Sequence, residues 1–154
     1  MKVRTLDKVE KIKGFTLIEL LVVVAIIALF TAFSLVAISY YRDKAKDARV
    51  EATLSQVRRV ATMIYNDSGS YADLCYEGTL KDGIEGDNSR NLKLIEDEVE
   101  RIRGSKPACY TDGSKYCVQS TLFVGGNYCV DSAGIAIETK DSLCNTGTNS
   151  CTAP

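Results

Sequence analysis

Six cysteines are the side chains of this chain best suited to chemistry, and all of them lie at or beyond residue 75. They are Cys75, Cys109, Cys117, Cys129, Cys144 and Cys151. The chain contains no histidine, which excludes Cys-His catalysis and histidine-based zinc sites. No Cys-x-x-Cys pair occurs either, so the spacing indicates neither a redox motif nor a zinc module. An even number of cysteines in one part of the chain favours disulfides formed in an oxidising compartment.

Few other residues point to catalysis. With 19 basic and 20 acidic side chains, the 154-residue chain has a formal net charge of −1, which does not indicate a nucleic-acid partner. The sequence shows no nucleophile–base pair, no phosphate-binding glycine loop and no metal-ligand cluster. We therefore expect no enzyme activity, no resident cofactor and no nucleic-acid partner.

One carboxylate, that of Glu19, stands in the most apolar part of the chain. The only polar residues among the 24 from 15 to 38 are two threonines, a serine and this glutamate, and no charged residue occurs from 20 to 41. A helix of that uncharged length rises about 33 Å, enough to cross the ~30 Å hydrocarbon core of a bilayer. Residues 15–41 are therefore predicted to span a membrane. Glu19 either reaches the headgroup layer or needs a partner in an apolar medium.

The residues before this segment predict its orientation. Residues 1–14 hold five basic and two acidic side chains, a net charge of +3. The positive-inside rule keeps this stretch in the cytoplasm and places the C-terminal part, with its cysteines, on the other side of the membrane. The apolar stretch is too long for an ordinary secretory signal peptide. We expect a single-pass protein of the inner (cytoplasmic) membrane with its head outside the cytoplasm.

The junction between leader and apolar segment carries a family signature. From Lys13 to Val23 the sequence reads KGFTLIELLVV, a charged leader that ends in glycine and continues directly into the apolar segment. This string resembles the prepilin signature of type IV pilins and type II secretion pseudopilins, over about residues 11–40. The resemblance implies an α+β, type IV pilin-like fold, in which a long N-terminal helix carries a small antiparallel β-sheet head.

The resemblance implies roles for three residues. Gly14 matches the last leader residue, after which an aspartyl prepilin peptidase cleaves. Phe15 matches the first mature residue, whose amino group is N-methylated. Glu19 matches the acidic residue at the fifth mature position, and its implied partner is the amino group of Phe15 on a neighbouring subunit.

Two functions share this signature. The first, which we favour, is a structural filament subunit that assembles with itself and other pilins into a cell-surface pilus. The second is a pseudopilin, which forms a periplasmic pseudopilus that drives protein secretion. Both imply the same partners: the prepilin peptidase, an assembly platform with its ATPase, and membrane lipid before assembly.

Residue patterning predicts the elements that carry these sites. Neither glycine nor proline occurs from 15 to 68, which predicts one helix, apolar to residue 41 and amphipathic over 42–68. A leader, 1–14, precedes this helix, and a head, 69–154, follows it. Four charged residues at the junction are interpreted as mixed interfacial charge: Asp43, Lys44, Lys46 and Asp47.

Within the head we expect a loop over 69–87, a second helix, and a meander of three strands between 115 and 139. A short fourth strand is expected around Cys109. The second helix is predicted from apolar residues at helical spacing, namely Leu92, Ile95, Val99 and Ile102. The acidic run 96–98 is interpreted as the solvated face of that helix rather than as a metal site.

The cysteines are interpreted as staples of a head with a modest core. Six cysteines allow 15 pairings. We predict the pairs Cys109–Cys117, Cys144–Cys151 and Cys75–Cys129. The pseudopilin side of the resemblance adds calcium as an alternative ligand of the head, in loops around Asp131, Asp141 or Asn145.

Overall fold

The computed structural model describes residues 14–81 and 86–152, and at 33–37 it describes the backbone only. The chain divides between Ser39 and Tyr40 into two compact units, here named the N-terminal unit and the head unit. Apart from Gly14, the predicted leader lies outside the described residues, as does most of the turn predicted around 81–87.

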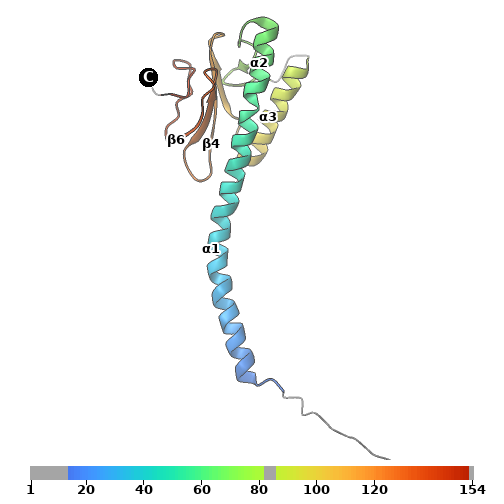
Figure 1. Cartoon of the computed structure of the whole chain (residues 1–154), viewed down its shortest axis with the longest axis vertical. Helices are drawn as coiled ribbons and strands as arrows, with labels where there is room; N and C mark the ends of the chain where they lie inside the picture. Colours follow the sequence, from blue (N-terminus) through green and yellow to red (C-terminus); the bar gives the residue numbers. More distant parts are fainter. Residues whose placement is uncertain (1–13, 82–85, 153–154) are drawn as a thin grey trace, which may run out of the picture. The chain divides into compact units, whose positions relative to one another are not determined.

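Three helices account for about half of the described chain (Figure 1). They are α1 (Leu17–Ser55), α2 (Val57–Ser68) and α3 (Asp87–Arg103). The single helix predicted over 15–68 is therefore divided at Gln56. The N–H group of Gln56 bonds to the carbonyl of Thr53, three residues back, at 3.1 Å, which is the tighter 3₁₀ pattern. Gln56 keeps helical dihedrals, φ −72° and ψ −24°, so neither glycine nor proline is needed for the interruption.

The predicted apolar stripes face inward. In the head unit, Val50, Leu54, Val57, Val60, Ala61 and Ile64 of α1 and α2 are all buried. On α3, Leu92, Ile95 and Val99 are buried and Ile102 packs against the same cluster. Both helices end where glycine permits a left-handed cap, at Gly69 for α2 and Gly104 for α3.

The main sheet is an antiparallel meander of four strands in the order β3-β4-β5-β6. The strands are β3 (Ala108–Thr111), β4 (Tyr116–Thr121), β5 (Asn127–Asp131) and β6 (Ala136–Thr139). This confirms the predicted meander together with its fourth strand. Helices and small antiparallel sheets occur together, as the predicted α+β fold requires.

The segment 69–87 was expected to be a loop and instead contains a short hairpin. Strand β1 (Cys75–Tyr76) pairs with β2 (Thr79–Leu80). The turn between them uses Glu77 and Gly78 at φ 48° and 85°, the left-handed conformation that two-residue hairpin turns need. A period-2 pattern cannot be recognised in strands of two residues, so no alternation of residue types marked this hairpin in advance.

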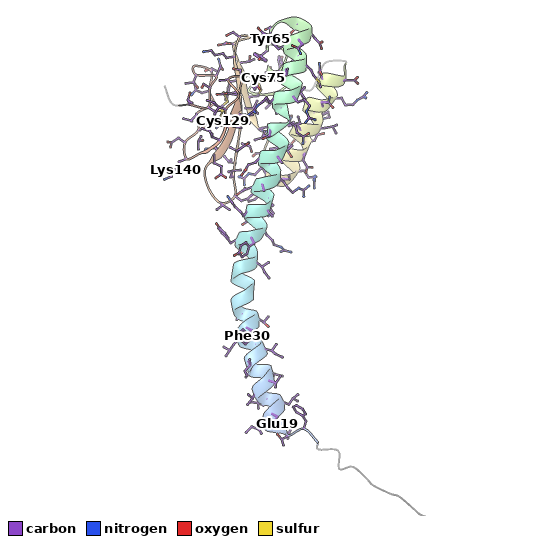
Figure 2. All side chains as sticks on the ribbon, in the orientation of Figure 1. Glu19, Phe30, Tyr65, Cys75, Cys129 and Lys140 are labelled. Carbon is purple, nitrogen blue, oxygen red and sulfur yellow. A yellow bond between two sulfur atoms is a disulfide. The ribbon has the colours of Figure 1, made fainter. Side chains whose placement is uncertain are left out.

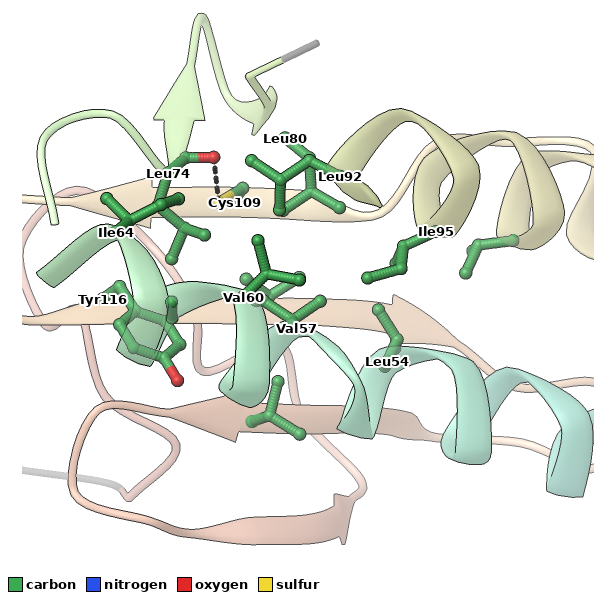
Figure 3. Close-up of a cluster of buried hydrophobic side chains, with 14 of the residues drawn as sticks. Leu54, Val57, Val60, Ile64, Leu74, Leu80, Leu92, Ile95, Cys109 and Tyr116 are labelled. Atoms are coloured by element: carbon green, nitrogen blue, oxygen red, sulfur yellow. Dashed lines mark hydrogen bonds between the residues drawn. The ribbon is translucent and has the colours of Figure 1, made fainter. Parts of the chain in front are cut away.

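Helices and sheet meet in one core (Figure 3). Val57 and Val60 lie opposite Leu92 and Ile95 of α3 in the close-up, and Tyr116 comes from the sheet. Tyr116 is only 2% exposed, and burial raises the pKa of its hydroxyl to about 12. The core therefore fixes the sheet against the amphipathic part of the helical segment.

The other face of the sheet is covered by the C-terminal tail. A second buried cluster there contains Cys117, Cys129, Cys144 and Cys151. The head unit thus has three layers: helices, sheet and tail.

Candidate functional site

The described part of the N-terminal unit begins with the residues of the predicted cleavage site. Gly14, Phe15 and Thr16 are exposed and precede α1. Phe15 is 79% exposed, and no other part of the described chain comes within 4 Å of where a Cβ at Gly14 would lie. The peptide bond between Gly14 and Phe15 is therefore in an open, non-helical stretch, the backbone state in which a peptidase can bind it.

Glu19 closes the N-terminal end of α1 (Figure 2). Its Oε2 accepts hydrogen bonds from the N–H of Thr16 at 2.9 Å and from the hydroxyl of Thr16 at 2.8 Å. In return the N–H of Glu19 donates to Oγ1 of Thr16 at 3.3 Å. This is a reciprocal capping box, which satisfies amide groups that would otherwise lack partners at a helix start.

The capping role of Thr16 was not among the residue roles predicted from the sequence. The signal was present, because a threonine followed three residues later by glutamate ahead of an apolar run is the sequence form of a capping box. Glu19 thus has a partner within its own chain as well as the intermolecular one that the resemblance implies. Both bonds from Thr16 go to one carboxylate oxygen, whereas a carboxylate accepts up to about four hydrogen bonds.

The large apolar side chains that follow are exposed. From Phe15 to Phe30 every leucine, isoleucine, valine and phenylalanine is between 45% and 88% exposed. Thr31, the polar residue that directly follows this stretch, donates its hydroxyl hydrogen bond to the carbonyl of Ile27 at 2.7 Å, within its own helix.

Within the described residues, no helix is both long enough and apolar enough to cross a membrane. The predicted span 15–41 includes residues 33–37, whose side chains lie outside the described part. Membrane anchoring stays a prediction.

All six cysteines are paired, but every predicted pair was wrong. The disulfides are Cys75–Cys109, Cys117–Cys144 and Cys129–Cys151. The predicted pairs Cys109–Cys117, Cys144–Cys151 and Cys75–Cys129 are therefore corrected.

Strand parity explains the correction. Cys109 lies opposite Val118, so Cys117, one residue away in register, points to the other face of the sheet. Cys109 belongs to the core cluster with the helices, whereas Cys117 and Cys129 belong to the cluster under the tail. Cys75–Cys129 and Cys109–Cys117 bonds would each have to pass through the sheet. Cys144 and Cys151 instead bond separately to strands β4 and β5.

Two buried polar side chains hold the tail as well. The amide oxygen of Gln119 accepts from the N–H groups of Leu143 and Cys144, both at 3.1 Å. The carboxylate of Asp131, 1% exposed, accepts from the N–H of Cys151 at 3.0 Å and from the β5–β6 turn. The sequence offered Asp131 as part of a candidate calcium-binding loop. In the structure its carboxylate oxygens accept hydrogen bonds from backbone N–H groups. No group of three or more metal-ligating side chains occurs within 14–81 and 86–152.

Two acidic residues were misread as solvated charge. Asp47 is 1% exposed and accepts hydrogen bonds from the N–H groups of Phe123 at 2.6 Å and Val124 at 2.9 Å. Glu96, also 1% exposed, accepts from the N–H of Leu80 at 3.1 Å and pairs with Lys106 at 2.5 Å. Both bind backbone of segments distant in sequence, so no local pattern marks them.

The remaining charges at the junction match their interpretation as mixed interfacial charge. Lys46 pairs with Asp43 at 3.2 Å, and Lys44 with Glu138 at 3.7 Å. These pairs are about half exposed and contribute little to stability.

Comparison with known proteins adds to this geometry. Residues 11–36 match the family model of the prokaryotic N-terminal methylation motif. The chain is also 36% identical over 74 residues to the type IV major fimbrial protein FimA of Dichelobacter nodosus. That similarity covers 48% of this chain and 46% of the relative, so it spans less than half of either protein. No solved structure matches the chain.

Proposed function

We propose that the chain is a type IV pilin-family protein and that it is a structural subunit of a surface pilus. The proposal includes processing after Gly14, methylation of the Phe15 amino group, and anchoring in the inner membrane by residues 15–41 until the subunit is assembled.

One observation carries the proposal: the methylation motif begins a helix whose large apolar side chains are exposed. The residues from Phe15 to Phe30 are 45% or more exposed wherever they are large and apolar. Apolar surface gains roughly 25 cal/mol per Å² when it is removed from water. Such a surface is stable only against lipid or against similar helices, which are the two environments of a pilin before and after assembly.

The open Gly14–Phe15 bond supports processing at this point. Cleavage there leaves the whole apolar stretch on the mature chain, in contrast to an ordinary signal peptide, whose apolar part is removed. It also creates a cationic amino group on Phe15, two residues before α1 begins at Leu17. That cation is the partner we propose for Glu19 of an adjacent subunit.

Glu19 would then have two tasks. Within its own chain it caps α1 through Thr16, and between chains it fixes the axial position of one helix against the next. A carboxylate packed among apolar helices without a cation is costly, so only arrangements that bring Phe15 of a neighbour to Glu19 are stable.

Electron microscopy of sheared surface fractions, with an antibody to this chain, tests the proposal. We expect long pili labelled along their length. Labelling restricted to short periplasmic or membrane material, together with secreted-protein defects in a deletion strain, would instead identify the pseudopilin that our sequence analysis left as the alternative.

A further inference from the structure

The loop between β4 and β5 presents two apolar side chains from a fixed backbone. In this loop, residues 122–126, Phe123 is 36% and Val124 41% exposed. The carboxylate of Asp47 binds both of their N–H groups. A Cβ at Gly126 would lie 2.6 Å from the carbonyl oxygen of Thr139, so the loop also packs closely on the end of β6. Its exposed side chains are held in place by these contacts.

Cations flank the exposed phenylalanine. Nζ of Lys46 lies 4.5 Å and the guanidinium carbon of Arg103 4.1 Å from the centroid of the Phe123 ring. Arg103 is positioned by a 2.7 Å hydrogen bond to the hydroxyl of Thr121. An aromatic ring between two cations favours a partner that offers both an apolar layer and negative charge.

Two tyrosines lie on the adjoining part of α1. Tyr40 and Tyr41 are 55% and 69% exposed. Tyr40 precedes Asp47 by seven residues. It therefore lies on the same side of the helix as Asp47, about 10 Å closer to the N-terminal end of α1. Tyrosine concentrates at membrane–water interfaces, and residue 41 is where the predicted span ends.

The charges at this end of the head unit are mixed. The cations are Arg42, Lys44, Lys46, Arg103 and Lys140, and the acidic residues are Asp43, Asp47, Glu51, Glu138 and Asp141. Of the acidic five, Asp47 is buried on backbone amides, which leaves five cations and four acidic side chains outside the core. Figure 2 shows Lys140 at this end of the head unit and Tyr65 at the opposite end.

We propose that this Phe123 surface, made of Tyr40, Tyr41, Lys46, Arg103, Phe123 and Val124, docks on the anionic headgroup layer of the membrane that holds residues 15–41. The docking rests on the proposed anchoring. Phe123 and Val124 enter the boundary between headgroups and acyl chains, while Lys46 and Arg103 bind lipid phosphates. The head of an unassembled subunit is then held down on the membrane by a contact separate from its anchor.

Single-tryptophan variants test this directly, because the chain contains no tryptophan. The full chain is reconstituted at high lipid-to-protein ratio in vesicles of phosphatidylcholine and phosphatidylglycerol with brominated acyl chains. In Phe123→Trp we expect the emission to shift to shorter wavelength and to be quenched by bromine. The matched control, Tyr76→Trp, replaces a 60% exposed ring in the β1–β2 hairpin and should be neither shifted nor quenched.

A third reporter, Phe30→Trp, separates this proposal from the anchoring on which it rests. Quenching of Phe30→Trp without quenching of Phe123→Trp overturns the docking and leaves the anchoring intact. Quenching of neither overturns both. Quenching of Phe123→Trp that weakens as protein density rises supports lipid as the occupant. A shift that appears only at high density, without quenching, overturns the proposal in favour of a neighbouring subunit.

Charge gives a second readout. Removing one cation with Lys46→Gln in the Phe123→Trp background should lower the ratio of docked to undocked heads about fivefold in anionic vesicles. Lys93→Gln, which removes a similarly exposed lysine from α3, should leave the ratio unchanged. Equal quenching in vesicles of phosphatidylcholine alone would contradict the role assigned to the cations.

Discussion

The N-terminal unit and the head unit solve the problem of apolar surface in opposite ways. The head unit buries its apolar residues in a core and locks both faces of its sheet with three disulfides. The N-terminal unit leaves its large apolar side chains exposed and satisfies its polar groups locally, through Thr16, Glu19 and Thr31. The head unit covers its apolar residues within one chain, whereas in our proposal the N-terminal unit is covered by lipid or by other subunits. We therefore expect substitutions in the N-terminal unit to change assembly, and substitutions in the head unit to change the free energy of unfolding.

The largest effect should come from the charge of Glu19. We expect Glu19→Ala to abolish pili without lowering the melting temperature of the head unit, because the hydrogen bonds of the Glu19 carboxylate go to Thr16 of the N-terminal unit. Counting pili by electron microscopy, beside denaturation of the same variant, measures both. Thr31→Ala is the matched control, since the Thr31 hydroxyl bonds within its own helix.

Glu19→Gln separates the two tasks of this residue. The amide oxygen can still accept from Thr16 and cap the helix, but the charge is lost. We expect few or no pili, as with alanine. Normal pilus numbers from the glutamine variant would show that capping, and not a charge pair with Phe15, is what assembly requires.

The second largest effect should come from the disulfides of the tail. Removing Cys117 and Cys144 together should lower the free energy of unfolding of the head by roughly 2–5 kcal/mol, measured by chemical denaturation. Delivery to the membrane and cleavage of the leader should continue. Non-reducing peptide mapping of the unsubstituted protein should recover Cys117 linked to Cys144. A peptide linking Cys109 to Cys117 would contradict the conclusion that these two residues lie on opposite faces of the sheet.

A moderate effect is expected at Asp47. Asp47→Asn replaces one of two charge-assisted acceptors for the Phe123 and Val124 amides and should cost about 2 kcal/mol of head stability. Asp43→Asn, four residues earlier on the same helix and in a half-exposed ion pair, should cost less than ~0.5 kcal/mol. Equal costs for the two variants in denaturation experiments would mean that the buried contact contributes nothing.

The smallest effect should be a pH dependence from Asp112 in the β3–β4 turn. Hydrogen bonds from the N–H of Lys115, and from the hydroxyl and N–H of Ser114, lower the pKa of its carboxyl to about 2. Because the unfolded value is near ~3.9, the contribution is present above that pH and is lost as the pH falls toward 2. Asp112→Asn should flatten this part of the acid denaturation curve, and an unchanged curve would exclude the contribution.

The features that could be predicted from the sequence depend on residues that are close to one another along the chain. The stripe from Val50 to Ile64, the helix that carries Leu92 to Ile102, and the meander all follow from spacings of two to four residues. The capping box of Thr16 and Glu19 was readable in the same way, although our sequence analysis missed it.

The predictions that were wrong concern features that depend on contacts between segments distant in sequence. The cysteine pairs are decided by which face of β3 and β4 each residue takes, and register is fixed only when the strands pair. Asp47 and Glu96 look like surface charges in sequence because their backbone partners lie 76 and 16 residues away. Composition could not reveal a two-residue hairpin either.

The central claim is that the exposed apolar helix is the assembly element of a processed pilin. Mass spectrometry of the N-terminal peptide from purified surface pili tests it most directly. We predict a chain that begins at Phe15 with a methylated amino group, present in the pilus fraction. Recovery of this chain only from membranes, with residues 1–14 still attached, would contradict it.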